Sequence, residues 1–206
     1  MGDGAKLYQV GVEERELMAA VLANTATLNQ FLASPAPFHE RHWYAVYTCA
    51  NHEKRIATQF AERSVEHFLP VYESVRRWKD RRMRLQLPLF PGYIFVNHSL
   101  QDRLRILQVP GVVRLVGFNG TAIALPAAEI EALRAGLQSP ARAEPHPYLT
   151  AGRRVRIVRG PFEGLEGVLL RRKGHFRVVL SLDLIMRSIA VDIETADIAI
   201  SRETLA

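Results

Sequence analysis

Cysteine is almost absent from this sequence, which has 206 residues and a single cysteine, Cys49. An internal disulfide is therefore excluded, and the composition fits a reducing compartment. Long apolar runs are also missing, because no window approaches the roughly 18 apolar residues of a membrane-spanning helix. The N-terminal residues lack the charged-then-apolar pattern of a secretion signal. We therefore expect a cytoplasmic protein with no membrane partner.

Motifs of catalysis are absent as well. No Ser or Cys lies in a nucleophile elbow, and the sequence has no P-loop, dinucleotide fingerprint or conspicuous acidic pair. Cys49 with a histidine as a nucleophile pair stays an open alternative. His39-x-x-His42 and Cys49-x-x-His52 contain metal-ligand types, but a predicted strand separates them and their span is shorter than in zinc fingers. We expect no enzyme, no cofactor and no metal.

Positive charge is abundant and unevenly spread. The chain has a net charge of +6 and a pI near 9.8, and Arg heavily outnumbers Lys. Residues 1–40 carry a net charge of −3, residues 41–139 carry +6 and residues 140–206 carry +3. This distribution favours a polyanionic partner for the body of the protein, and Arg suits bidentate phosphate or carboxylate contacts. Solvated surface charge is the alternative.

The densest basic run, from Arg76 to Arg84, precedes the apolar stretch Leu87 to Val96. Pro91-Gly92 divides that stretch and predicts a type II turn, because Pro presets φ and Gly accepts a positive φ. Beyond the turn, alternation predicts a strand whose Tyr93 and Phe95 share one face. Spacing alone allows a buried hairpin with a charged arm as well as an interaction surface.

The order of the predicted elements indicates an α+β protein. A helix is expected over residues 8–33, ended by a proline-rich segment at 34–37. A strand at 43–48, a helix from the N-cap Asn51 to about Ser64, and later strands and helices follow in the order β-α-β-β-α-β-α. This order predicts an α/β sandwich with helices on one face of an antiparallel sheet. Residues 139–151, with three prolines and no periodicity, are predicted as a linker.

The C-terminal residues are almost purely β. Val155 and Ile157 alternate with arginines, and the same period recurs from Phe176 to Leu182 and from Ile189 to Ile193. Glycine-containing turns separate these strands. Four or five short strands in about fifty-five residues predict a small barrel, which avoids exposed sheet edges.

These motifs resemble a known family. WYAVYT followed by a helix, then LPLFPGYIFV and VPGVVRLVGF, resemble the N-terminal domain of NusG-type transcription elongation and antitermination factors. GRRVRIVRGPFEGLEGVLL resembles a KOW motif, whose SH3-like β-barrel follows that domain. The stretch RSVEHFLPVYESVRRWKDRRMRLQ is closest to the specialised UpxY and RfaH type paralogues. The resemblance covers about residues 42–200. Together with the predicted N-terminal helix and the proline-rich linker, it divides the chain into a helical extension at 1–40, a NusG N-terminal-like domain at 41–138, the linker at 139–151 and the barrel at 152–206.

The resemblance also implies a monomer that binds the clamp region of RNA polymerase and suppresses pausing or termination. The residues carried over by motif position as polymerase contacts are Tyr47, Phe90, Tyr93, Phe95, Leu115, Asp102 and Arg103. The family's His-Thr-Thr motif near Asp102 is absent here. Burial of Phe95 and Leu115 in the core is the competing interpretation.

Nucleic-acid contacts are implied in two places. In the specialised paralogues the first helix of the domain touches the non-template DNA strand, and Lys54, Arg55 and Gln59 fall on that surface. The basic arm is a second candidate, on physical grounds, because cations contact phosphates and an aromatic ring at Trp78 stacks on bases. Its members are Arg76, Arg77, Lys79, Arg81, Arg82 and Arg84.

In this family the barrel recruits a ribosomal small-subunit protein or the termination factor Rho. The corresponding loop is Leu184, Ile185, Met186 and Arg187, whose apolar residues would be costly to expose without a partner. A general NusG-like factor that couples polymerase to Rho or the ribosome is one alternative. A KOW-type RNA-binding or ribosome-binding protein is another, although it would leave the WYAVYT and FPGYIFV motifs unexplained.

Overall fold

The computed structural model describes residues 39–78, 81–118, 120–149, 152–172 and 175–200. The helix predicted over residues 8–33 lies outside these ranges, as does Lys79. Within the described ranges, no helix is long and apolar enough to cross a membrane.

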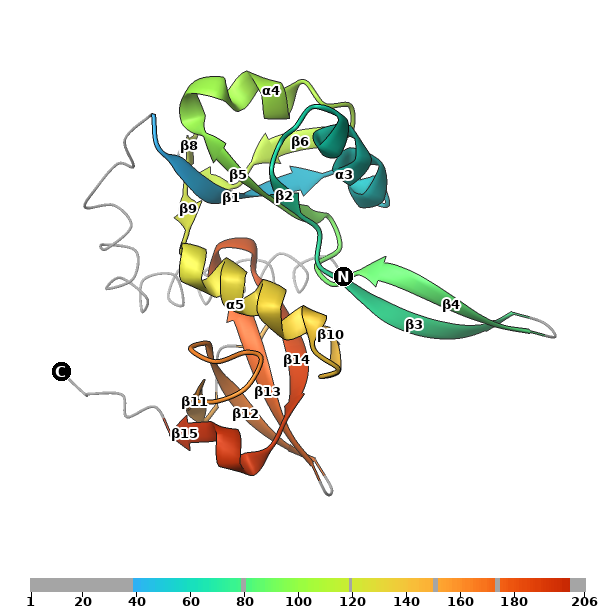
Figure 1. Ribbon diagram of the computed structural model, residues 1–206, viewed down its shortest axis with the longest axis vertical. Helices are drawn as coiled ribbons and strands as arrows, with labels where there is room; N and C mark the ends of the chain where they lie inside the picture. Colours follow the sequence, from blue (N-terminus) through green and yellow to red (C-terminus); the bar gives the residue numbers. More distant parts are fainter. Residues whose placement is uncertain (1–38, 79–80, 119, 150–151, 173–174, 201–206) are drawn as a thin grey trace, which may run out of the picture. The chain divides into compact units, whose positions relative to one another are not determined.

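The N-terminal part is built on an antiparallel sheet with β1 (Arg41–Thr48) in its interior (Figure 1). β1 pairs with β5 (Tyr93–Ser99), and this register places Tyr47 opposite Tyr93. On its other edge β1 pairs with β6 (Val112–Leu115) and β9 (Ala124–Leu125), while β2 (His67–Phe68) pairs with β5. The remaining elements of this part are α3 (Glu53–Glu62), η1 (Leu100–Asp102), α4 (Arg103–Leu107), α5 (Ala127–Gln138), β7 (Gly117–Phe118) and β8 (Thr121–Ala122).

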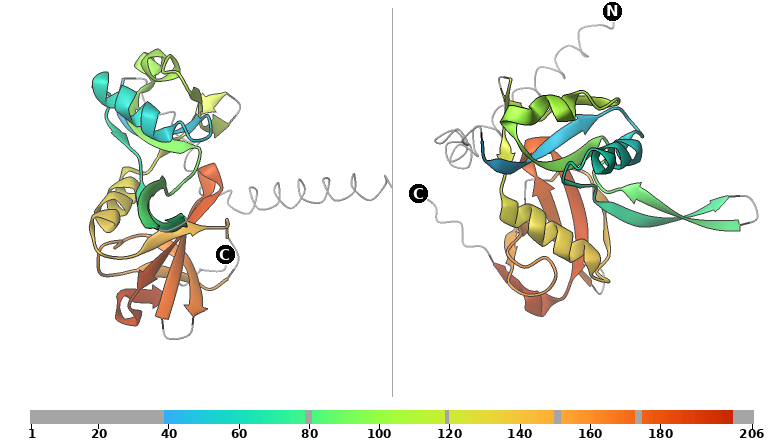
Figure 2. Two further views of the ribbon diagram at one scale, coloured as in Figure 1. Left: turned by 90° about the vertical axis from the view of Figure 1, so that its right-hand side faces the viewer. Right: turned by 45° about the horizontal axis from the view of Figure 1, so that its top comes forward.

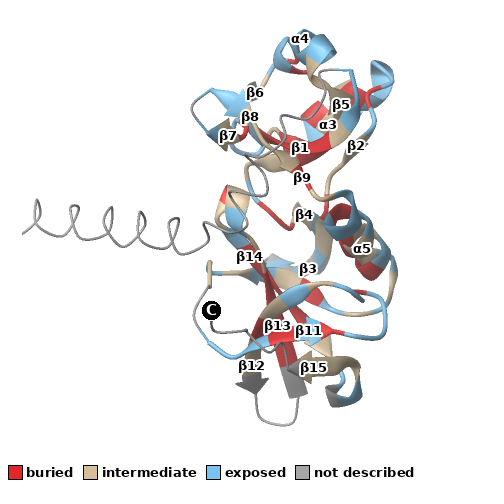
Figure 3. Cartoon of the chain, turned by 90° about the vertical axis from the view of Figure 1, so that its left-hand side faces the viewer, coloured by how far each residue is buried: buried red, intermediate tan, exposed pale blue. Residues whose placement is uncertain are grey.

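Helices cover both faces of this sheet, whereas the sequence predicts them on one face. One apolar cluster joins α3 and α4 to the face of β1 that carries Tyr44 and Val46. The other joins α5 to the face that carries Trp43 and Ala45. Successive residues of a strand point to opposite faces, so β1 is buried on both sides (Figure 3). The prediction fails because the side on which α5 packs depends on contacts that are distant in sequence.

The limits of α3 differ from the prediction. Its N-cap is His52 rather than Asn51, and it ends at Glu62 rather than near Ser64. Asn51 and Ser64 adopt positive φ angles of 61° and 53°. Asn tolerates this left-handed conformation better than most residues, and helices commonly end beside a left-handed residue. Both residues therefore flank the helix without belonging to it.

β3 (Val71–Trp78) and β4 (Arg81–Pro88) form a separate two-stranded antiparallel sheet, called here the β3–β4 ribbon. Its register runs without interruption from Val71 opposite Pro88 to Trp78 opposite Arg81. The ribbon projects away from the sheet of β1, as two views show (Figures 1 and 2). The basic arm of the sequence is thus the outer half of one hairpin.

The C-terminal part is a six-stranded antiparallel sheet in the order β10-β14-β13-β12-β11-β15, in keeping with the predicted small barrel. Its strands are β10 (Ala143–His146), β11 (Arg154–Ile157), β12 (Glu166–Arg172), β13 (His175–Leu182), β14 (Arg187–Ile193) and β15 (Ile198–Ile200), with the short helices η2 (Asp183–Ile185) and η3 (Thr195–Asp197). Apolar positions alternate inward along β11, where Val155 and Ile157 are fully buried.

Strand β10 lies inside the segment that the sequence predicts as a linker. It pairs with β14, and an ion-pair network fixes it to the barrel. The Arg177 guanidinium donates to Glu144 of β10 and to Asp192 of β14, the second at 2.6 Å. Four residues of segment 139–151 therefore belong to the barrel sheet.

Candidate functional site

The Phe90–Tyr93 turn is held by backbone and side-chain hydrogen bonds. The Tyr93 amide donates to the Phe90 carbonyl at 3.0 Å, and Gly92 has a φ of +85°, which confirms the predicted type II geometry. The Gly92 carbonyl accepts from the Thr48 amide at 2.9 Å. A Cβ at Gly92 would lie 3.4 Å from Tyr47 Cε2. The Tyr47 ring thus lies directly over the turn, and the positive φ is what requires glycine at position 92.

Glu53 adds a second anchor to this turn. Its carboxylate Oε1 accepts a hydrogen bond of 2.7 Å from the Gly92 amide, and the residue is only 4% exposed. Glu53 lies in the first turn of α3, and its hydrogen bond to the turn at Gly92 is not predicted from the sequence. The two residues are 39 positions apart, and the sequence carries no local signal that joins them. The carboxylate couples the start of α3 to the turn.

An aromatic surface forms beside the turn, called here the tyrosine surface and made of Tyr47, Tyr93 and Arg114. The Tyr47 and Tyr93 ring centroids are 5.4 Å apart and their planes are tilted by 48°, a favourable aromatic arrangement. Arg114 faces Tyr47 across the β1–β6 pair, and its guanidinium lies 5.7 Å from the Tyr47 ring centroid. Tyr47 is 37% exposed, although most of β1 is buried. The structure thus presents two rings and one cation on a fixed turn.

The structure separates the other predicted polymerase contacts from this surface. Phe90 and Phe95 are 1% and 0% exposed, and their rings pack edge to face in the core. Leu115 pairs with Val46 and packs in the cluster on the α3 side of the sheet. Phe90 and Phe95 therefore support the turn from within. The sequence prediction does not include Arg114. Neighbouring residues of β6 point to opposite faces of the sheet, so Arg114 lies on the face that carries Tyr47, whereas Leu115 lies on the other face.

Asp102 and Arg103 lie exposed at the junction of η1 and α4. Ser99 accepts from the Gln101 amide at 3.4 Å, so it caps η1. This segment is thus a 3₁₀ turn followed by a short α-helix. This junction forms a solvated corner of the domain.

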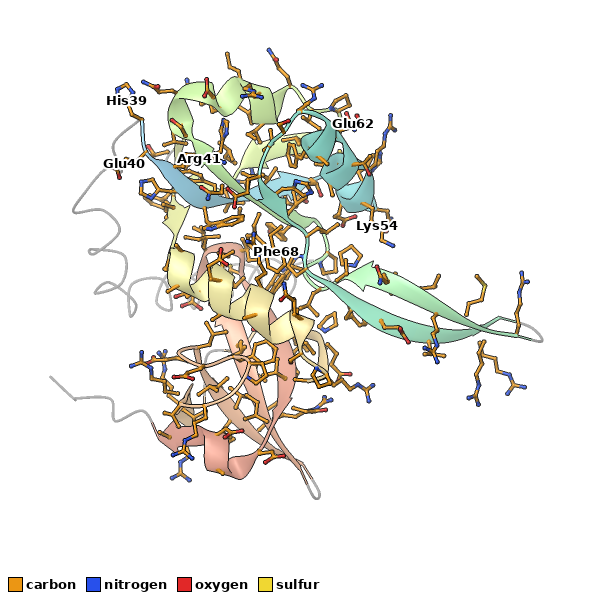
Figure 4. The ribbon with its side chains drawn as sticks, viewed as in Figure 1. His39, Glu40, Arg41, Lys54, Glu62 and Phe68 are labelled. Atoms are coloured by element: carbon orange, nitrogen blue, oxygen red, sulfur yellow. The ribbon has the colours of Figure 1, made fainter. Side chains whose placement is uncertain are left out.

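The predicted DNA-contacting residues of α3 do not behave alike. Lys54 and Arg55 are exposed, and Figure 4 shows Lys54 at one end of α3. Gln59 is half-buried, and its Nε2 has no hydrogen-bond partner within the described part of the chain. Two cations of α3 are therefore available to a polyanion, whereas Gln59 faces partly into the domain.

The predicted partner loop of the barrel lies against the tyrosine surface. Ile185 is 3% exposed and belongs to the same apolar cluster as Phe90 and Phe95. The Arg187 guanidinium lies 5.6 Å from the Tyr93 ring centroid, whereas Arg114 lies over the Tyr47 ring. Met186 has a left-handed φ of 50° that turns the chain into β14. Two sites predicted separately thus meet at Tyr93.

The predicted histidine and cysteine pairs do not converge. The described residues contain no group of three or more His, Cys, Asp or Glu side chains that could hold a metal ion. His42 lies opposite His98 in the β1–β5 ladder, whereas the exposed Cys49 follows the end of β1.

Comparison with known proteins gives a consistent result. A family model described as "Transcription termination factor nusG" matches residues 41–134. The chain is 26% identical over 169 residues to the transcription termination/antitermination protein NusG of Lactococcus lactis (strain IL1403), covering 75% of this chain and 90% of that protein. It is 29% identical over 150 residues to the protein of the same name from Escherichia coli (strain K12), covering 66% and 81%.

A solved structure described as "Domain interaction in Thermotoga maritima NusG" superposes with a TM-score of 0.51 and 19% identity, covering 81% of this chain and all of that one. At this identity the match supports the fold. Together with the family model and the curated relatives, it confirms the resemblance drawn from the WYAVYT and FPGYIFV motifs. Residues 41–134 match the NusG family model, and most of the chain is similar to NusG-type transcription termination/antitermination proteins.

Proposed function

We propose that this chain binds the clamp region of RNA polymerase through the tyrosine surface and thereby suppresses pausing and termination. The observation that carries the proposal is the ring pair Tyr47 and Tyr93, held on a turn that Glu53 and Thr48 fix by hydrogen bonds. Rigid aromatic anchors give large contact area at low entropic cost and often dominate an interface. Arg114 adds a positive charge, which suits a partner with acidic side chains around an apolar ridge.

The barrel is the candidate site for a second partner. Ile185 is buried, so Leu184, Met186 and Arg187 are the residues that the loop offers to a ribosomal small-subunit protein or to Rho. Because Arg187 lies over Tyr93, the proposed contact residues for polymerase and for the second partner are adjacent. The exposed Lys54 and Arg55 of α3 are the candidate contacts with the non-template strand.

Affinity for core RNA polymerase tests the proposal. We expect Tyr47→Ala and Tyr93→Ala each to weaken binding by roughly tenfold or more, because central aromatic anchors typically contribute over about 1.4 kcal/mol. Phe118→Ala is the matched control, since Phe118 is 55% exposed and lies on β7, outside the tyrosine surface. The thermal unfolding midpoint of each variant shows whether weaker binding comes from a lost contact with polymerase or from a destabilised fold.

Two outcomes would count against this function. Wild-type protein that fails to bind polymerase refutes it, and so does an equal loss for Phe118→Ala and the tyrosine variants. Arg187→Ala sharpens the test, because removal of the cation over Tyr93 should leave polymerase affinity equal or higher. Transcription assays with and without Rho then distinguish antitermination from general coupling.

A further inference from the structure

The β3–β4 ribbon concentrates most of the net charge of this protein. Residues 71–88 contain six basic and two acidic residues, a net charge of +4 against +6 for the whole chain. The family model matches this segment as part of a larger domain and assigns it no ligand. A positive charge of this density on a projecting hairpin favours contact with a polyanion.

The register divides the ribbon into two different faces. Directly opposite residues of an antiparallel pair point to the same face, and alternate residues point to opposite faces. One face therefore carries Val75 opposite Arg84 and Arg77 opposite Arg82, and all four residues are exposed. The other face carries Tyr72, Met83 and Leu85, which are half-buried, and the exposed Arg81 near the tip. The cations of the first face, called here the arginine face, are thus presented together to solvent.

The arginine face is electrostatically unfavourable in the free protein. Arg77 and Arg82 lie directly opposite each other, and like charges in this arrangement destabilise a strand pair. Arg84 forms an ion pair with Glu73 at 3.6 Å, between side chains that are 79% and 54% exposed. Among the described residues, no acidic side chain forms an ion pair with Arg77 or Arg82. A polyanion that approaches this face relieves the repulsion.

The length and width of the ribbon can be compared with the grooves of duplex DNA and RNA. Its strands are eight residues each, which corresponds to a length of about 26 Å at about 3.3 Å per residue. The B-form major groove is about 12 Å wide and admits a two-stranded ribbon, whereas the A-form RNA groove is too narrow and deep. Single-strand binding relies on aromatic rings that stack on bases. The exposed positions of the arginine face, Glu73, Val75, Arg77, Arg82, Arg84 and Gln86, include no aromatic residue, and Trp78 pairs with Arg81 outside this set.

We propose that the arginine face of the β3–β4 ribbon binds double-stranded DNA through its phosphates, with Arg77, Arg82 and Arg84 as the contacts. This goes beyond the proposed function, because the contact requires neither polymerase nor the tyrosine surface. The partner is duplex DNA rather than the single non-template strand, for which the family resemblance suggests α3. The ribbon would give the protein a second hold on the DNA template.

Fluorescence anisotropy with the full chain and no polymerase tests this proposal. The probes are a labelled 30-base-pair DNA, one of its single strands and a double-stranded RNA of the same length. Three phosphate contacts predict a slope of about −2.7 in a plot of log affinity against log salt. Arg77→Gln/Arg82→Gln/Arg84→Gln should abolish this slope and weaken duplex binding by about 10²-fold at 0.1 M salt.

The matched control is Arg153→Gln/Arg156→Gln/Arg159→Gln, which removes the same charge from exposed residues at β11. The control should keep most of the affinity and slope, and both variants should melt at the wild-type temperature because all six residues are exposed. The proposal is overturned if the wild type does not bind the duplex, if single-stranded DNA or duplex RNA binds as tightly, or if both variants lose affinity equally. The last result would indicate diffuse attraction to a basic protein.

Discussion

Removal of the Glu53 carboxylate should loosen the Phe90–Tyr93 turn and lower the stability of the N-terminal part. In Glu53→Ala the Gly92 amide loses a 2.7 Å hydrogen bond to a charged acceptor that is 4% exposed. Such bonds contribute about 1.5–3 kcal/mol, and an acidic residue in the first turn of a helix adds about 0.3–1 kcal/mol. We therefore expect the free energy of unfolding to fall by about 2–4 kcal/mol. Glu53→Gln keeps an acceptor oxygen and should lose about half as much.

Urea unfolding followed by tryptophan fluorescence and circular dichroism measures this change. Trp43 is 3% exposed on β1 and belongs to the same apolar cluster as Phe90 of the turn. Glu62→Ala is the control, because Glu62 is exposed at the C-terminal end of the same helix (Figure 4). Its removal should be neutral or slightly stabilising, since an acid is unfavourable at that end of the helix dipole. If Glu53→Ala costs less than about 0.5 kcal/mol, the reasoning about a buried, charge-assisted bond is wrong.

Three further perturbations follow from the same structure. Gly92→Ala forces a left-handed φ of +85° on a residue with a Cβ and should lower the free energy of unfolding, measured in urea, by about 1–2 kcal/mol. The NMR resonances of the Tyr47 ring should also shift, because the new Cβ lies against that ring. Unchanged resonances would contradict the packing of the ring on the turn. Arg177→Leu leaves the carboxylates of Glu144 and Asp192, which are 30% and 40% exposed, without their cation. It should destabilise the barrel by about 2–3 kcal/mol. Arg142→Leu is the control, because the Arg142 side chain is 73% exposed. Burial, followed by the nearby charge of Asp183, raises the pKa of Tyr148 to about 12. The neutral phenol is favoured in the folded state, so its contribution to the free energy of unfolding is present below pH 10 and lost as the pH rises toward 12. Tyr148→Phe should therefore flatten the curve of stability against pH in this range. Parallel curves for the variant and the wild type would refute the prediction.

Local chemistry explains which parts of the fold the sequence predicts correctly. Pro91-Gly92 specifies its own turn, and the alternation along the C-terminal strands specifies the barrel sheet. Strand β10 escapes prediction because Pro145 interrupts any strand pattern. Proline is tolerated there because β10 lies at the edge of its sheet and pairs only with β14.

The candidate site is predictable only in part. Family resemblance brings Tyr47 and Tyr93 together, and the observed ladder places them opposite each other. Spacing could not decide whether Phe95 is core or interface, because β5 is covered on both faces and both alternating sets look apolar. Glu53 depends on a contact 39 residues away, so only the folded chain shows its role.

Site-specific photo-crosslinking shows directly whether the tyrosine surface touches RNA polymerase. A photoreactive phenylalanine analogue is placed at Tyr47 in the full chain and, as a control, at Phe118, which is exposed on β7. We expect irradiation of elongation complexes to crosslink position 47 to the polymerase clamp, whereas position 118 gives no such product. Absence of a crosslink at position 47 from a protein that still binds the complex, or equal crosslinking at position 118, would contradict it.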